Sequence, residues 1–203
     1  IERHYLAKLP DADKAIITIG RVFGEGKDRL HQFSYLLSAA EMRLIKAVSE
    51  AFHAEGKRLI VVLDVGGIVD MTAWQDMADA IVVSWLPGCE AGHAVASVLS
   101  GRETPSGRLP MSVPVSYYDD PTACSMPQIL TDKPVNYSFY RPAPAGIKKR
   151  YDLENIDYVN YREGIYSGYR YYVTEKVRTA YPFGFGLSYT DFRYSGMTVE
   201  EDG

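Results

Sequence analysis

The clearest indication of fold class in this chain is the segment Arg58-Leu59-Ile60-Val61-Val62-Leu63-Asp64. It is rich in β-branched residues and almost uniformly apolar, which is typical of a strand buried on both faces of a parallel sheet. Two shorter runs of the same kind flank it in the sequence, at Lys14–Gly20 and at Ala80–Trp85. The sequence therefore predicts three neighbouring strands of one parallel sheet.

The segments between and after these strands carry helical patterns. A helix is expected over Ser38–Glu55, because Ser38 and Glu41 form a capping-box pattern and apolar residues recur every three or four positions after them. Shorter helices are expected over Met71–Met77 and Glu90–Ser100. The alternation predicts right-handed crossovers and an α/β fold, with a mostly parallel sheet sandwiched between helices.

Three strands are few for a complete domain of this class, so we expect the sheet to be incomplete, with its first strands before Ile1. The chain has no initiating Met, and we expect it to be an internal segment of a longer protein. After Gly101 prolines become frequent, and regular helices are not expected through about residue 150. The C-terminal third is a Tyr/Gly/Pro-rich extension, in which we expect short extended segments that pack on the sheet domain.

The composition limits the classes of partner. The chain has 203 residues, 46% of them hydrophobic, and a net charge of −4, so we expect a sizeable core and no nucleic-acid partner. No apolar run approaches the roughly 20 residues that span a bilayer, so no membrane partner is expected. Cys89, Cys124 and the four scattered histidines match no metal-binding spacing, and we expect neither a metal nor a cofactor. No targeting segment is present; the compartment stays open, with the cytoplasm favoured over a periplasmic or secreted location.

A glycine-flanked carboxylate follows the first predicted strand, in Arg21-Val22-Phe23-Gly24-Glu25-Gly26-Lys27-Asp28-Arg29. Ligands of open α/β sheets bind at the carboxyl ends of the strands, and glycine lets a backbone approach a ligand closely. Glu25 is therefore a candidate proton donor. The alternative is a structural carboxylate that pairs with Arg21, Lys27 or Arg29.

The same loop superficially resembles a phosphate-binding loop, but the match fails. Five residues separate Gly20 from Gly26, and Asp28 stands where Ser or Thr would bind magnesium. The third glycine of a dinucleotide fingerprint is also absent. An unrelated nucleotide-binding domain is thus a disfavoured reading. A Ser nucleophile on a Gly-x-Ser-x-Gly elbow is absent too.

Five motifs follow one another along the chain, from about Asp13 to Tyr194, and taken in order they are specific. They are Arg21-x-x-Gly24-Glu25-Gly26-x-Asp28-Arg29, Leu86-Pro87-Gly88-x-Glu90-x-Gly92, Thr104-Pro105-Ser106-Gly107-Arg108-Leu109-Pro110, Tyr161-x-Glu163-Gly164-Ile165-Tyr166-x-Gly168-Tyr169-Arg170-Tyr171 and Pro182-Phe183-Gly184-Phe185-Gly186-Leu187-Ser188-Tyr189. In this order they resemble the α/β-sandwich domain of glycoside hydrolase family 3, the β-glucosidase group.

This resemblance implies part of a retaining exo-β-glycosidase, foremost a β-glucosidase that hydrolyses terminal β-D-glucosyl residues of a β-glucoside or oligosaccharide. It implies that Glu25 is the general acid/base, and that a (β/α)8 barrel domain outside this chain carries the aspartate nucleophile. Arg21, Phe23, Asp28 and Arg29 would bind substrate or position the loop. Residues 1–194 would form the sandwich domain, partial at its N-terminus, and 195–203 a linker towards a fibronectin type III-like domain.

The sequence departs from the family pattern at three positions. Phe23 stands where many relatives have Ser, Cys89 where Gln is usual, and Ala91 in place of a Gly. None of these removes Glu25, but Phe23 would alter the pocket near the leaving group. The alternative function is a non-catalytic structural or carbohydrate-binding module that packs on a partner domain, with Glu25 held only in a salt bridge.

Overall fold

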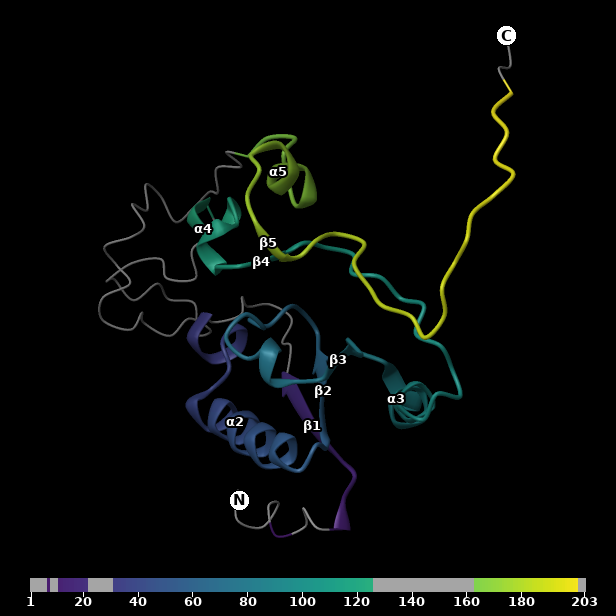
Figure 1. Cartoon of the computed structure of the whole chain (residues 1–203). Helices are drawn as coiled ribbons and strands as arrows, with labels where there is room; N and C mark the ends of the chain where they lie inside the picture. The colour runs from purple at the N-terminus through teal and green to yellow at the C-terminus, as the bar shows by residue number, and fades with distance from the viewer. Residues whose placement is uncertain (1–6, 8–10, 22–30, 126–162, 201–203) are drawn as a thin grey trace, which may run out of the picture.

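The computed structural model of the chain describes residues 7, 11–21, 31–125 and 163–200, and its centre is a three-stranded parallel sheet (Figure 1). The strands are β1 (Lys14–Arg21), β2 (Arg58–Val65) and β3 (Ala80–Val83), in the order β1-β2-β3. In register, Ile17 of β1 pairs with Val61 of β2, which pairs with Ile81 of β3. The three predicted strands and their parallel arrangement are confirmed.

Helix α2 (Ala39–Ala54) covers one face of this sheet. It begins where the sequence predicts, because Ser38 Oγ accepts a hydrogen bond from the Glu41 N–H at 3.2 Å and the Glu41 carboxylate accepts one from the Ser38 N–H at 2.7 Å. It ends before Gly56, whose φ of +69° is a conformation that glycine adopts without strain.

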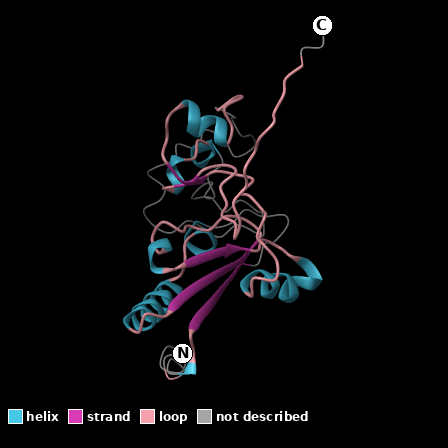
Figure 2. Cartoon of the chain, turned by 45° about the vertical axis from the view of Figure 1, so that its right-hand side comes forward, coloured by secondary structure: helices cyan, strands magenta, loops and turns pink. Residues whose placement is uncertain are grey.

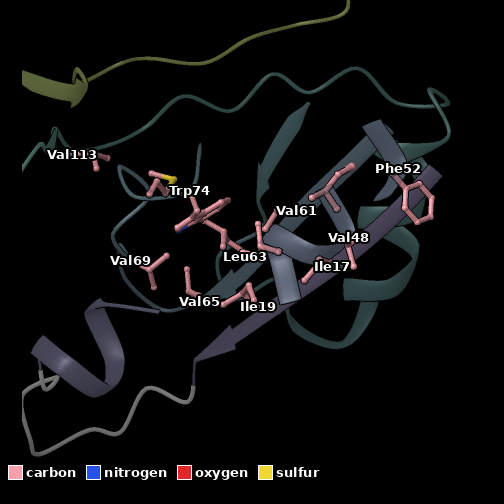
Figure 3. Close-up of a cluster of buried hydrophobic side chains, with 13 residues drawn as sticks. Ile17, Ile19, Val48, Phe52, Val61, Leu63, Val65, Val69, Trp74 and Val113 are labelled. Atoms are coloured by element: carbon pink, nitrogen blue, oxygen red, sulfur yellow. The ribbon is translucent and has the colours of Figure 1, made fainter. Parts of the chain in front are cut away.

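The hydrophobic core lies between α2 and the sheet (Figure 3). It combines alternate residues of the strands with one stripe of the helix and with side chains from segments further along the chain: Ile17, Ile19, Val61, Leu63, Val65, Val48, Phe52, Val69, Trp74 and Val113. Burying one large apolar side chain contributes about 1.5–3 kcal/mol, so this cluster is the main source of stability in the described part of the chain.

Helix α3 (Ala91–Leu99) lies on the opposite side of the sheet from α2 (Figures 1 and 2). The residues of β2 and β1 that point to this side are unequally covered. Val62 is 3% exposed, whereas Ile16, on the edge strand β1, is 55% exposed. Within the described residues, the second face of the sheet is therefore only partly covered.

Two expected elements are shorter than the sequence predicts. Strand β3 ends at Val83, two residues before Trp85, because Trp85 has a φ of +57° and leaves the extended conformation. The helix expected over Met71–Met77 is a 3₁₀ turn, η3 (Gln75–Met77), and the chain before it forms a turn around the buried ring of Trp74. Helix α3 begins after another 3₁₀ turn, η4 (Gly88–Glu90).

The motif that ends at Pro110 and the motif that begins at Pro182 lie side by side. Strand β4 (Val113–Pro114) pairs antiparallel with β5 (Thr179–Tyr181). Beyond this short ladder, Leu109 N–H donates to the Phe185 carbonyl and Gly184 N–H donates to the Leu109 carbonyl, both at 2.8 Å. These motifs therefore build one structural unit.

The tyrosine-rich third contains one of the expected short extended segments, β5, but it also contains a helix that was not expected. Tyr169–Thr174 forms a helix, α5, which follows Gly168 with a φ of +60°. Its Tyr172 is buried and its hydroxyl donates to Asp120 Oδ2 at 3.0 Å, so tertiary contact outweighs the weak helical tendency of tyrosine. Burial and the Asp120 carboxylate raise the pKa of Tyr172.

Short helices also interrupt the proline-rich segment, where none were expected. They are the 3₁₀ turn η5 (Tyr117–Asp119) and the single turn α4 (Thr122–Ser125). Ser116 caps η5 by accepting from the Tyr118 N–H at 3.3 Å, and Asp120 bonds the Thr122 N–H at 2.8 Å. Side-chain caps thus form single turns between prolines that forbid longer helices.

After Tyr189 the described chain forms neither helix nor strand and runs away from the rest of the molecule (Figures 1 and 2). Its side chains are exposed, as at Tyr194 and Met197. Among the described helices, none combines the length and the apolar character needed to cross a membrane.

Candidate active site

The carboxyl ends of the three strands meet at one edge of the sheet, which is where the predicted acid/base loop begins. Four of the predicted site residues, Phe23, Glu25, Asp28 and Arg29, lie outside the described residues. The structure does describe the residues on both sides of them: Arg21 at the end of β1, and the π-helical turn η2 (His31–Tyr35). We call these flanking residues, Arg21 and η2, together with the side chains that they contact, the frame of the site.

The Arg21 side chain forms four hydrogen bonds in this frame, and only 11% of it is exposed. Its Nη1 and Nη2 donate to Oε1 and Oε2 of Glu41 at 2.8 and 2.9 Å, which is the bidentate geometry of a guanidinium–carboxylate pair. Its Nε donates to the Ser34 carbonyl at 3.2 Å, and Nη1 also donates to the Gly20 carbonyl at 2.8 Å. One side chain thus joins the end of β1, the turn η2 and the start of α2.

The carboxylate of Glu41 is shared between Arg21 and the cap of α2. Its Oε2 accepts hydrogen bonds from the Ser38 N–H at 2.7 Å and from the Ser38 hydroxyl at 2.8 Å, in addition to the bond from Arg21. Burial alone would raise the pKa of Glu41, but these hydrogen bonds and the Arg21 charge outweigh it and lower the pKa. Glu41 is therefore ionised at neutral pH.

Aromatic rings pack against His31, the first residue of η2. The His31 ring lies 5.7 Å from Tyr35, 4.7 Å from Tyr117 and 5.6 Å from Tyr118, measured between ring centroids. The backbone joins the same place, since Asp70 N–H donates to the Tyr35 carbonyl at 2.8 Å. Burial lowers the pKa of His31, against the opposing charge of Asp70, so its ring is neutral at pH 7. Besides Arg21, two segments distant in the sequence, at Asp70 and at Tyr117–Tyr118, therefore contact η2.

The third strand adds a strained backbone to the same edge. Trp85, with its positive φ, lies two residues beyond the end of β3, and the side chain of Leu86 after it is exposed. Positive φ at a residue other than glycine is a form of strain that collects at functional sites. Glu90, from the same motif, is exposed and bonds His93 Nδ1 at 2.7 Å.

A Ser-His-Asp string lies elsewhere, beside the start of β2. Ser49 Oγ is 3.2 Å from His53 Nδ1, and His53 Nε2 is 2.9 Å from Asp79 Oδ2. No sequence pattern predicts it, because Asp79 is 26 residues from His53 and no nucleophile elbow surrounds Ser49.

This string joins α2 to the sheet and is not a nucleophile site. Ser49 is buried, and its hydroxyl donates to the Met77 carbonyl at 2.8 Å, so it is not presented to a substrate. Asp79 is bonded by Arg58 Nη1 at 2.6 Å and by the Leu59 N–H at 2.8 Å. These bonds, followed by the one from His53, lower the pKa of Asp79.

Comparison with known proteins identifies relatives over almost the whole chain. The model of the glycosyl hydrolase family 3 C-terminal domain matches residues 3–189. Beta-glucosidase B of Emericella nidulans is 35% identical over 174 residues, which cover 84% of this chain and 18% of that protein. An exo-α-(1→6)-L-arabinopyranosidase of Bifidobacterium longum is 30% identical, over 100% of this chain and 23% of that protein.

A solved structure shares both the sequence and the fold. It is that of beta-glucosidase 3B from Thermotoga neapolitana in complex with glucose, with a TM-score of 0.80 and 39% identity. The match covers 100% of this chain and 25% of that one. The chain therefore spans about a fifth to a quarter of the length of the relatives it matches.

Proposed function

Because this chain belongs to glycosyl hydrolase family 3, as part of its C-terminal domain, we propose that it supplies the general acid/base of a retaining exo-β-glycosidase. The acid/base is Glu25, and the aspartate nucleophile comes from a barrel domain outside the chain. The observation that carries this proposal is the place of Glu25 in the sequence, between two glycines and four residues after Arg21. Arg21 is the last residue of β1, and ligands of open α/β sheets bind at the carboxyl ends of the strands.

The chemistry needs two carboxyl groups about 5–5.5 Å apart, one as nucleophile and one that acts first as acid and then as base. The acid must be protonated when substrate binds, which requires a site that is partly removed from water. A glutamate on a glycine-flanked loop, closing against another domain, meets both needs. Phe23, Asp28 and Arg29 would then line or shape the loop.

A partner domain is supported by the surface around α5. Large apolar side chains are exposed on α5, just before it in the chain and at Phe183, whose ring lies 4.8 Å from that of Tyr169. They are Ile165, Tyr166, Tyr169, Val173 and Phe183, and exposed apolar patches mark contact surfaces. The relatives are also about four to six times longer than the part of them that this chain matches. We propose that the barrel domain packs on this chain, that residues 1–194 belong to the sandwich domain, and that residues 195–203 lead towards a fibronectin type III-like domain.

The names of the relatives favour a β-glucoside as substrate, and the arabinopyranosidase defines the competing sugar that should be assayed beside it. A terminal β-D-glucosyl residue of an oligosaccharide is the proposed substrate of the complete enzyme.

The test is Glu25→Gln in the complete enzyme. Hydrolysis of an alkyl β-glucoside, whose leaving group needs protonation, should fall by a factor of about 100 or more. Hydrolysis of a dinitrophenyl β-glucoside, whose leaving group departs unaided, should fall far less in its first step, and azide should accelerate turnover of this activated substrate.

An equal and mild loss on both substrates would reject the acid/base role. It would favour the alternative function, a structural or carbohydrate-binding module in which Glu25 forms only a salt bridge.

A further inference from the structure

We infer that Arg21 and Glu41 form a positioning clamp for the acid/base loop, and that Glu41 is required for efficient proton donation although it caps a helix. This inference rests on the proposed function of Glu25. The clamp is defined as the Arg21 guanidinium, the Glu41 carboxylate and the Ser34 carbonyl.

The clamp joins the two sides of the predicted loop in the chain. Arg21 precedes the predicted loop, and Ser34 follows it. Arg21 Nε donates to the Ser34 carbonyl at 3.2 Å, so one side chain bonds the backbone on both sides of residues 22–30, at Gly20 and at Ser34. The spacing between the two ends of the loop is thereby fixed by a single guanidinium.

The guanidinium is itself held by Glu41. Both of its terminal nitrogens bond the Glu41 carboxylate, at 2.8 and 2.9 Å, and its side chain is mostly buried. A planar guanidinium with two parallel bonds to a carboxylate has a defined orientation, which an ammonium group would not have. Glu41 is in turn fixed to the first turn of α2, the helix that packs on the core.

The role of Glu41 in the clamp is chemically distinct from its role in helix capping. A capping box accepts either Glu or Gln, because only a side-chain oxygen is needed for the Ser38 N–H. Holding Arg21 with two charge-assisted bonds requires a carboxylate. Glu41→Gln therefore preserves the cap and weakens the clamp, which makes it a selective probe.

The experiment measures kcat/KM of the complete enzyme for the alkyl and the dinitrophenyl β-glucoside, in Glu41→Gln and in Arg21→Lys. The ratio of the two values does not depend on how much enzyme is folded. We expect kcat/KM for the alkyl glycoside to fall about tenfold or more relative to that for the activated one, because small displacements of a catalytic group slow the step it assists.

The matched control is Glu50→Gln on the same helix. Glu50 forms an exposed ion pair with Lys46 at 3.9 Å, so this variant makes the same chemical change outside the clamp. Its ratio should equal that of the unmodified enzyme.

The inference fails if Glu41→Gln and Arg21→Lys keep the ratio of the unmodified enzyme while Glu25→Gln changes it. If Glu25→Gln itself leaves the ratio unchanged, the proposed function fails instead. A change of the ratio in Glu50→Gln as large as that in Glu41→Gln would also reject the clamp.

Discussion

At the scale of single residues, several charged side chains of the described structure form hydrogen bonds and ion pairs that connect one element to another. Arg21 and Glu41 join β1 to α2, and Asp79 joins α2 to β2 through His53, Arg58 and the Leu59 N–H. Such bonded carboxylates stabilise the fold only while they are ionised. The stability of the chain should therefore depend on pH in the acid range.

Asp79→Asn tests this dependence. Because the folded-state pKa of Asp79 lies below its ordinary value, the stabilisation is complete above the unfolded-state pKa of about 3.9 and is lost as the pH falls through the folded-state pKa. The variant should be less stable than the unmodified chain at pH 6. The difference should shrink as the pH falls below about 4, as measured by denaturant unfolding across this range. A difference that stays constant down to pH 2 would contradict this account.

Residue-level contacts were predictable from the sequence only where they are local. The capping pair of Ser38 and Glu41 follows from a spacing of three residues and a known geometry. The bonds from Arg21 to Glu41, 20 residues away, depend on how β1 and α2 pack, and no periodicity encodes that. The buried string from Ser49 to Asp79 escaped prediction for the same reason.

At the scale of elements, the strands and α2 followed from hydrophobic patterning because tertiary context agrees with local preference there. The end of β3 did not follow from this patterning, because the last residues of the predicted strand leave the extended conformation at Trp85. Helix α5 did not follow from it either, because a tyrosine-rich sequence favours strands locally, whereas the burial of Tyr172 favours the helix. The pairing of the Ser106-Gly107-Arg108 and Phe185-Gly186 motifs is the clearest case of a contact that sequence order hides.

Gly186→Ala tests that pairing. A Cβ at this position would lie 2.8 Å from both the Arg108 Cδ and the Gly107 carbonyl oxygen, so the two segments would have to separate. The free energy of unfolding should fall by about 1–3 kcal/mol, the usual effect of overpacking. Thermal and denaturant unfolding of the chain would measure it.

Gly107→Ala is the matched control, since a Cβ there would meet no atom within 4 Å. Its stability should stay within about 0.5 kcal/mol of the unmodified chain. Equal losses in the two variants would show that glycine is needed for backbone freedom and not for close approach.

At the scale of the whole molecule, the described chain has surfaces that a larger protein would cover. The second face of the sheet is partly open at Ile16, and apolar side chains of α5 face outwards at Tyr169 and Val173. The family match and the length of the relatives agree with this picture. The α/β class and the family were predictable from the sequence. The position of Glu25 relative to a nucleophile was not, because that nucleophile is proposed to lie in another domain.

We propose that Glu25 donates the proton to the leaving group, and the pH dependence of kcat/KM reports the ionisation of that donor. For an alkyl β-glucoside, kcat/KM of the complete enzyme should decline at alkaline pH as the acid loses its proton. In Glu25→Gln this alkaline limb should be absent and kcat/KM should be low at every pH. An alkaline limb that persists unchanged in Glu25→Gln would contradict the account, because another group would then carry the proton.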